Sequence, residues 1–253
     1  MALPGMKGLC DAWIVKLNSS GTLEWQKCLG GTNDEWLDDL KSTSDGGYIL
    51  TGQTESNDGD VSGFHGGGTY DCWVVKLDSS GSIVWQRCLG GTGTDGGGAI
   101  QQTSDGGYIV CGWSNSNDGD VSGNHGGTDI WLVKLDSTGN TVEWQKSIGG
   151  SGSDVGVDVY QCSDGGYVIG GYSNSNNGDA SVNKGSYDIW VVKTDDGGNV
   201  EWEKSIGSTY YDYNTKVYQA SDGEYIVGGT AYSGGDKSTS YGVDDIWIVK
   251  LGY

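Results

Sequence analysis

The sequence has little proline, phenylalanine or positive charge. Its 253 residues include one proline, one phenylalanine and 14 lysines and arginines, against 34 aspartates and glutamates. The net charge of −20 repels phosphate backbones and anionic lipid, so we expect no nucleic-acid partner. No window approaches the run of about 18 apolar residues that a membrane helix needs. We therefore expect no insertion into a membrane.

An apolar signal segment is also missing from the first ten residues. We interpret residues 1–10 as an N-terminal lead or tag. Two locations remain open. The protein is either extracellular or on the cell surface, with its signal outside this chain, or it is cytoplasmic.

Glycine, tryptophan and tyrosine are plentiful. The chain has 48 glycines, 11 tryptophans and 15 tyrosines, which is typical of many short strands joined by tight turns. An Asp-x-Trp motif recurs five times at intervals of 57 to 60 residues, at Trp13, Trp73, Trp131, Trp190 and Trp247. A second motif, Ser-Asp-Gly-Gly-Tyr, follows the same period, with Glu in place of the second glycine in its last copy. Such periods indicate propellers, solenoids or arrays.

Each period contains four strand-like runs. In the second period they cover about residues 71–77, 83–89, 99–103 and 108–113, and several are apolar on both faces. A sheet covered on both faces is what a propeller blade requires. We therefore predict an all-β fold, a β-propeller with four blades of four antiparallel strands.

The grouping of these runs predicts the domain layout. The chain begins with a pair of strands, continues through three complete blades and ends with three strands, so that the N- and C-terminal strands close the ring. We expect a single domain over 11–253, with repeats at about 11–70, 71–128, 129–187 and 188–244 and a terminal strand at 245–253. The fifth Asp-x-Trp strand is then surplus. This strand is displaced, pairs with a neighbouring molecule or belongs to a longer array. A further alternative is that two chains form one eight-bladed ring.

The repeat over 71–112 is similar to known repeats. Its pattern, Asp-x-Trp-x-Val-Lys-Leu-Asp followed by Trp, Gly-Gly and Asp-Gly-Gly-Tyr-Ile-Val, resembles the β-propeller repeats of bacterial and archaeal secreted or surface proteins. It is more distantly similar to kelch repeats. The turns at 43–47 and 103–107 resemble Asp-box hairpins, although Cys162 and Ala220 replace the threonine in later copies. The resemblance implies a propeller and leaves the activity open, because propellers include enzymes, lectins and scaffolds.

Acidic loops contain the candidate metal ligands. The stretch Ser-Asn-Asp-Gly-Asp begins at residues 56 and 116, and Ser-Asn-Asn-Gly-Asp begins at residue 175. Side-chain oxygens two residues apart, with glycine between them, can converge on Ca²⁺, which is the candidate cofactor. The same side chains can instead cap turns by bonding their own backbone. The candidate ligands are Asp58, Asp60, Asp118, Asp120 and Asp179.

Some aromatic residues depart from the repeat. Nine of the eleven tryptophans fall on two repeat positions, and we expect them to pack between blades. Trp36, Trp113, Tyr210, Tyr211 and Tyr213 do not follow the pattern. We interpret these five as candidates for stacking on a sugar or a partner protein. The alternative is chance exposure or local core packing.

Lysines and cysteines predict structural contacts. A lysine recurs on the Asp-x-Trp strand, and we expect it to form an ion pair with the aspartate of the Asp-Gly-Gly turn. We expect Cys72 to face Cys88 across a hairpin and Cys10 to lie diagonal to Cys28. These positions predict either disulfides or buried free thiols.

No residue stands out as catalytic. The two histidines, His65 and His125, lack the spacing of a zinc site, and no nucleophile elbow or phosphate loop is present. We expect a non-catalytic binding or adhesion module whose ligand, a glycan or a protein, lies on the loop face. The alternatives are a structural or self-assembling scaffold subunit stabilised by calcium, with homo-oligomers formed through the surplus strand, and a glycoside hydrolase.

Overall fold

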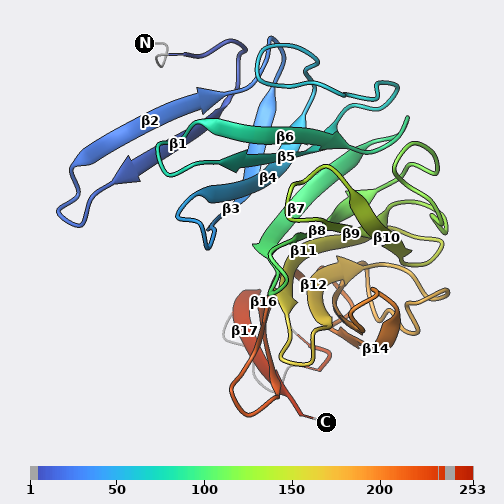
Figure 1. The fold of residues 1–253 in the computed structure, drawn as a ribbon. Coiled ribbons are helices and arrows are strands. Elements are labelled where there is room, and N and C mark those ends of the chain that lie inside the picture. The colour runs from blue at the N-terminus through green and yellow to red at the C-terminus, as the bar shows by residue number, and fades with distance from the viewer. Residues whose placement is uncertain (1–4, 233, 237–242, 253) are drawn as a thin grey trace.

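Figure 1 shows the fold in a computed structural model, which describes residues 5–232, 234–236 and 243–252. These ranges contain seventeen β-strands, and no helix in them is long and apolar enough to span a membrane. Residues 1–4 of the expected lead and Tyr253 of the expected terminal strand lie outside the described part. The strands are β1 Ala12–Leu17, β2 Leu23–Leu29, β3 Glu35–Ser42, β4 Tyr48–Thr54, β5 Asp71–Leu77, β6 Ile83–Leu89, β7 Asp95–Gln102, β8 Tyr108–Ser114, β9 Asp129–Leu135, β10 Val142–Ile148, β11 Asp154–Gln161, β12 Tyr167–Ser173, β13 Asp188–Thr194, β14 Val200–Ile206, β15 Tyr213–Gln219, β16 Tyr225–Tyr232 and β17 Asp244–Leu251.

The strands form separate antiparallel sheets in chain order. β1 pairs with β2, three four-stranded sheets follow (β3 to β6, β7 to β10 and β11 to β14), and β15 to β17 form the last sheet. Within every sheet, strands that are neighbours in the chain are also hydrogen-bonded neighbours. The all-β class and the predicted grouping of strands are therefore confirmed.

Tight turns reverse the chain between strands. Between β5 and β6, the Asp78 side chain accepts a hydrogen bond from the Ser80 backbone at 2.8 Å. Gly81 in this turn has a φ of 77°, a left-handed conformation that glycine adopts without steric cost. Between β7 and β8, Asp105 accepts a hydrogen bond from the Gly107 backbone at 2.9 Å. Short polar side chains and glycine thus build each sheet as a meander.

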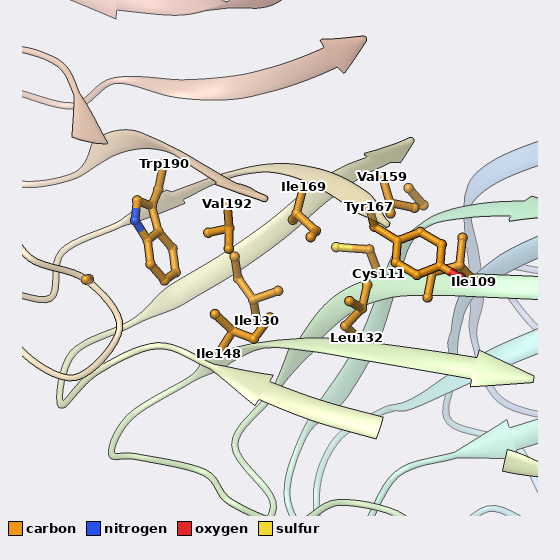
Figure 2. Packing of buried hydrophobic residues seen from close by; sticks show 12 residues of the cluster. Ile109, Cys111, Ile130, Leu132, Ile148, Val159, Tyr167, Ile169, Trp190 and Val192 are labelled. Carbon is orange, nitrogen blue, oxygen red and sulfur yellow. The ribbon is translucent and has the colours of Figure 1, made fainter. Parts of the chain in front are cut away.

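Successive sheets pack face to face through the Asp-x-Trp strands. Figure 2 shows Ile130 and Leu132 of β9 in one buried cluster with Trp190 of β13, which belongs to the next sheet. On the other face of β9, Trp131 lies in a cluster with Val74 of β5 in the preceding sheet. The motif tryptophans of β5, β9 and β13 are at most 1% exposed, which confirms their expected role in packing between sheets. The same expectation is wrong for Trp13 of β1, which is 49% exposed.

The terminal strands do not complete one blade together. β1 and β2, in blue, lie at the opposite end of Figure 1 from β16 and β17, in red, and the two pairs belong to different sheets. β17 pairs with β16 as β5 pairs with β4, because Trp247 lies opposite Gly229 and Trp73 lies opposite Gly52. The last sheet therefore already contains an Asp-x-Trp strand and has no place for β1. Among the described residues, the predicted closure by the N- and C-terminal strands is wrong, and the surplus strand is the physical reason.

Side-chain amides link the turns of neighbouring sheets. The Ser44 backbone donates to Gln102 Oε1 at 2.8 Å, and the Ser104 backbone donates to Gln161 Oε1 at 2.8 Å. The same contact joins the turns of the last two sheets. Each sheet is thus connected to its neighbour by polar as well as apolar contacts.

The predicted ion pairs are present. Lys76 lies 2.9 Å from Asp45, and the corresponding lysines of β9, β13 and β17 lie 2.7 to 3.0 Å from the equivalent turn aspartates. Lys16 of β1 instead pairs with Glu24, because the sheet of β1 and β2 has no Asp-Gly-Gly turn. Although burial acts in the opposite direction, hydrogen bonds from Thr103 and Lys134 lower the pKa of Asp105 to about 2.

The predicted disulfides are not formed, because all six cysteines are free thiols. Cys72 lies opposite Leu89, and Cys88 lies opposite Trp73. The cause is a register shift between Lys76 and Leu77, which moves the rest of the hairpin by one residue. The alternative of buried free thiols is confirmed for four of the six cysteines, Cys72, Cys88, Cys111 and Cys162.

We expect Asp45→Asn to destabilise the protein more than Asp105→Asn does. Lys134 has a second carboxylate partner, Glu143 at 3.0 Å, whereas Val84 occupies the equivalent position beside Lys76. Losing the charge of Asp45 leaves the buried Lys76 without a carboxylate, which should cost about 1 to 3 kcal/mol of unfolding free energy. Urea unfolding measures both variants. Equal costs would contradict this account of the ion pairs.

Thiol accessibility provides a second test of the fold. Burial raises the pKa of Cys72 to about 12 and that of Cys162 to about 11, and a thiol reacts only as the thiolate. We expect iodoacetamide at neutral pH to label the half-buried Cys10 and Cys28 in the folded protein. The four buried thiols should react only after unfolding, as peptide mass spectrometry would show. Fast labelling of Cys72 in the native protein would contradict the packing described above.

Candidate functional site

The long loops leave one end of the sheets and are fastened to neighbouring turns. Asp58 accepts hydrogen bonds from the backbone and hydroxyl of Thr32 at 2.7 and 2.9 Å. Asp118 accepts the same pair from Thr92 at 2.7 and 2.7 Å, and these bonds lower the pKa of Asp118. Asn177 takes this place in the third loop. An uncharged side chain therefore performs the same structural task.

The other three candidate metal ligands hold the glycine that follows each hairpin. Asp60, Asp120 and Asp179 accept hydrogen bonds from the backbones of three equivalent glycines at 3.2, 3.4 and 3.1 Å. The five candidates are thus distributed over three loops. Among the described residues, no three His, Cys, Asp or Glu side chains form a group that could hold a metal ion. Calcium binding by these residues stays a prediction.

A buried aspartate begins the Asp-x-Trp strands β5, β9 and β13. Asp71 accepts a hydrogen bond from the His65 backbone at 2.8 Å, and His65 Nδ1 lies 2.7 Å from the same oxygen. In β13, Asp188 accepts its hydrogen bond from the Lys184 backbone. Burial raises the pKa of both carboxyl groups. Their Oδ1 atoms are buried and have no hydrogen-bond partner within the described part of the chain.

The structure brings two of the five candidate ligand-binding aromatics together. Tyr211 and Tyr213 line one pocket. Tyr210 is exposed and lies near Tyr232, with ring centroids 6.1 Å apart. Trp36 contacts the ring of Tyr70 in the sheet of β3 to β6. Trp113 lies on β8, where its ring covers Gly96 at a distance that leaves no room for a side chain.

The pocket of Tyr211 and Tyr213 also contains Tyr172 near the end of β12 and Tyr187 directly before β13. The cavity has a volume of about 370 Å³. Tyr187 stacks on Tyr211 with ring centroids 5.5 Å apart, and the edge of Tyr172 meets Tyr187 at 5.5 Å. Burial raises the pKa of Tyr172, so its hydroxyl is protonated at neutral pH and can donate a hydrogen bond.

Sequence reasoning missed Tyr172 and Tyr187. Tyr172 takes the repeat position of Trp113, because each lies opposite the isoleucine of the Asp-Ile-Trp motif in its sheet. Tyr187 takes the position of Tyr70, the residue before the strand. Comparing repeats position by position, with tyrosine and tryptophan counted together, would have found both.

A second hollow lies at the opposite end of the strands, among the Asp-Gly-Gly turns. One part, of about 730 Å³, is lined by residues that include Tyr160 and Tyr218. The adjoining part, of about 480 Å³, is lined by residues of β3, β7, β11 and β15 and contains one carboxylate, Asp158. Asp158 accepts a hydrogen bond from the Val217 backbone at 3.0 Å. The first part is also lined by a carboxylate, Asp222, which lies 2.7 Å from Lys250. The glycoside hydrolase alternative, which needs a pair of carboxylates, stays a prediction.

The chain matches no protein-family model, and no curated protein is significantly similar to it in sequence.

Proposed function

We propose that this protein is a non-catalytic binding module that takes a carbohydrate at the tyrosine pocket of its long-loop face. The observation that carries the proposal is the grouping of Tyr172, Tyr187, Tyr211 and Tyr213 around one cavity. Its volume of about 370 Å³ falls within the range of about 300 to 1,000 Å³ that is usual for small-molecule sites.

The chemistry of the pocket fits a sugar ring. Tyrosine offers an apolar ring face against which the C–H groups of a sugar can pack, and a hydroxyl that exchanges hydrogen bonds with sugar hydroxyls. The exposed ring of Tyr211 forms one wall, so a ligand can enter from solvent. Three of the four tyrosines, Tyr172, Tyr187 and Tyr211, are held by neighbouring rings, so binding costs them little side-chain freedom.

We also propose that the sheets are propeller blades arranged around an axis lined by β3, β7, β11 and β15. The hollow lined by residues of all four strands supports this arrangement. A binding or adhesion role outside the cell or on its surface would fit such a module, and calcium at the acidic loops remains part of the proposal.

A glycan array followed by calorimetry tests the proposed function. We expect the wild-type chain to bind a defined set of glycans. Tyr211→Ala and Tyr187→Ala should weaken binding at least about five-fold, which corresponds to about 1 kcal/mol per lost ring contact. Running the array with and without EDTA shows whether a metal contributes.

The matched control is Tyr218→Ala. Tyr218 is also an exposed tyrosine, but it lies in the hollow at the opposite end of the strands. Its removal should leave glycan affinity unchanged. The absence of any bound glycan, or an equal loss in the control, would contradict the proposed site.

A further inference from the structure

One packing rule joins all the sheets. Each Asp-x-Trp strand has two faces. The tryptophan face of β1 carries Trp13 and Val15, and its reverse face carries Ala12 and Ile14. The reverse face of β1 lies in one buried cluster with Trp73 and Val75 on the tryptophan face of β5. The same combination recurs for Cys72 and Val74 with Trp131 and Val133, for Ile130 and Leu132 with Trp190 and Val192, and for Ile189 and Val191 with Trp247 and Val249.

The tryptophan face of β1 lacks such a cover. Trp13 is 49% exposed and Val15 is 40% exposed, whereas the equivalent Trp73 and Val75 are 1% and 0% exposed. No strand of the described part packs on this face as β1 packs on β5. An apolar face of the kind that is buried elsewhere in the chain is therefore open to solvent.

The reverse face of β17 is uncovered in the same way. Ile246 is 85% exposed and Ile248 is 69% exposed, whereas the equivalent Ile189 and Val191 of β13 are 2% and 0% exposed. The two open faces are of different kinds. One is a tryptophan face and the other is a reverse face, so they are the two halves of the contact that the chain makes repeatedly within itself.

The lysine of β17 shows the same difference. Lys250 pairs with Asp222 just as Lys193 pairs with Asp164. The side chain of Lys250 is 48% exposed, while that of Lys193 is 1% exposed because it lies under the next sheet. A sheet placed on the reverse face of β17 would bury a lysine whose charge already has a carboxylate partner.

We propose that the reverse face of β17 binds the tryptophan face of β1 from a second copy of this chain, head to tail. A second copy carries the matching face, and the two faces of one copy lie at opposite ends of the molecule (Figure 1). The contact goes beyond the proposed sugar binding, because neither face includes the tyrosine pocket. It is heterologous, so a copy added to one face leaves the other face open until either a ring closes or an open array forms.

Charge substitutions on the two faces test this arrangement. Val15→Lys blocks the face on β1, and Ile248→Lys blocks the face on β17. Sedimentation velocity should show oligomers of the wild-type chain that grow with concentration, and each variant alone should be a monomer. A mixture of the two variants should form a one-to-one dimer and nothing larger, because one open face remains on each.

The control is Val182→Lys, an exposed valine in the loop between β12 and β13, which should assemble like the wild type. Unfolding midpoints verify that the variants fold, and Trp13→Glu and Ile246→Lys provide a second variant on each face. A wild-type chain that stays monomeric at every concentration would overturn the proposal. A single variant that still assembles would also overturn it, because it would indicate pairing through strand edges or like faces. A mixture of the two variants that yields no dimer would overturn it as well.

Discussion

The structure depends on one contact, in which the reverse face of each Asp-x-Trp strand covers the tryptophan face of the next. A single sheet of three or four short strands cannot bury both of its faces, so each sheet is stable only against its neighbours. The glutamine contacts between turns follow from this stacking, because each of them joins two sheets. The stacking also shields the paired lysines of β5, β9 and β13 from solvent. The polar contacts thus act together with apolar burial.

Much of the architecture could be predicted from the repeat. Two motifs with one period, and runs that are apolar on both faces, were enough to place the strands and group them into sheets. The error about ring closure could not be seen from the sequence. β1 and β17 are both Asp-x-Trp strands and would need the same position in a shared blade, but this conflict appears only once β17 is known to pair with β16. The disulfides failed for a local reason. A single bulge beside Leu77 changes which residue faces Cys72, and nothing in the surrounding sequence identifies that bulge.

The candidate site was predictable only in part. Tyr211 and Tyr213 departed from the repeat and were found for that reason. Tyr172 and Tyr187 occupy repeat positions of one sheet, and only its meeting with the sheet of β15 to β17 brings them to the cavity of Tyr211 and Tyr213. In the acidic loops, a clear sequence pattern was visible but did not reveal what the side chains do. Asp58 and Asp118 formed a clear pattern, but the structure shows that their carboxylates hold the neighbouring turns, a task that needs no bound ion.

The uniform contact between sheets also bears on how such a chain can change in evolution. Because each interface combines the same two kinds of face, a duplication or deletion of one whole period would join a reverse face to a tryptophan face again. Gene rearrangements in steps of about 59 codons would therefore preserve the packing, whereas steps of half a period would bring unlike strands together. The number of sheets is in this sense a variable that drift and selection can adjust without redesigning a core.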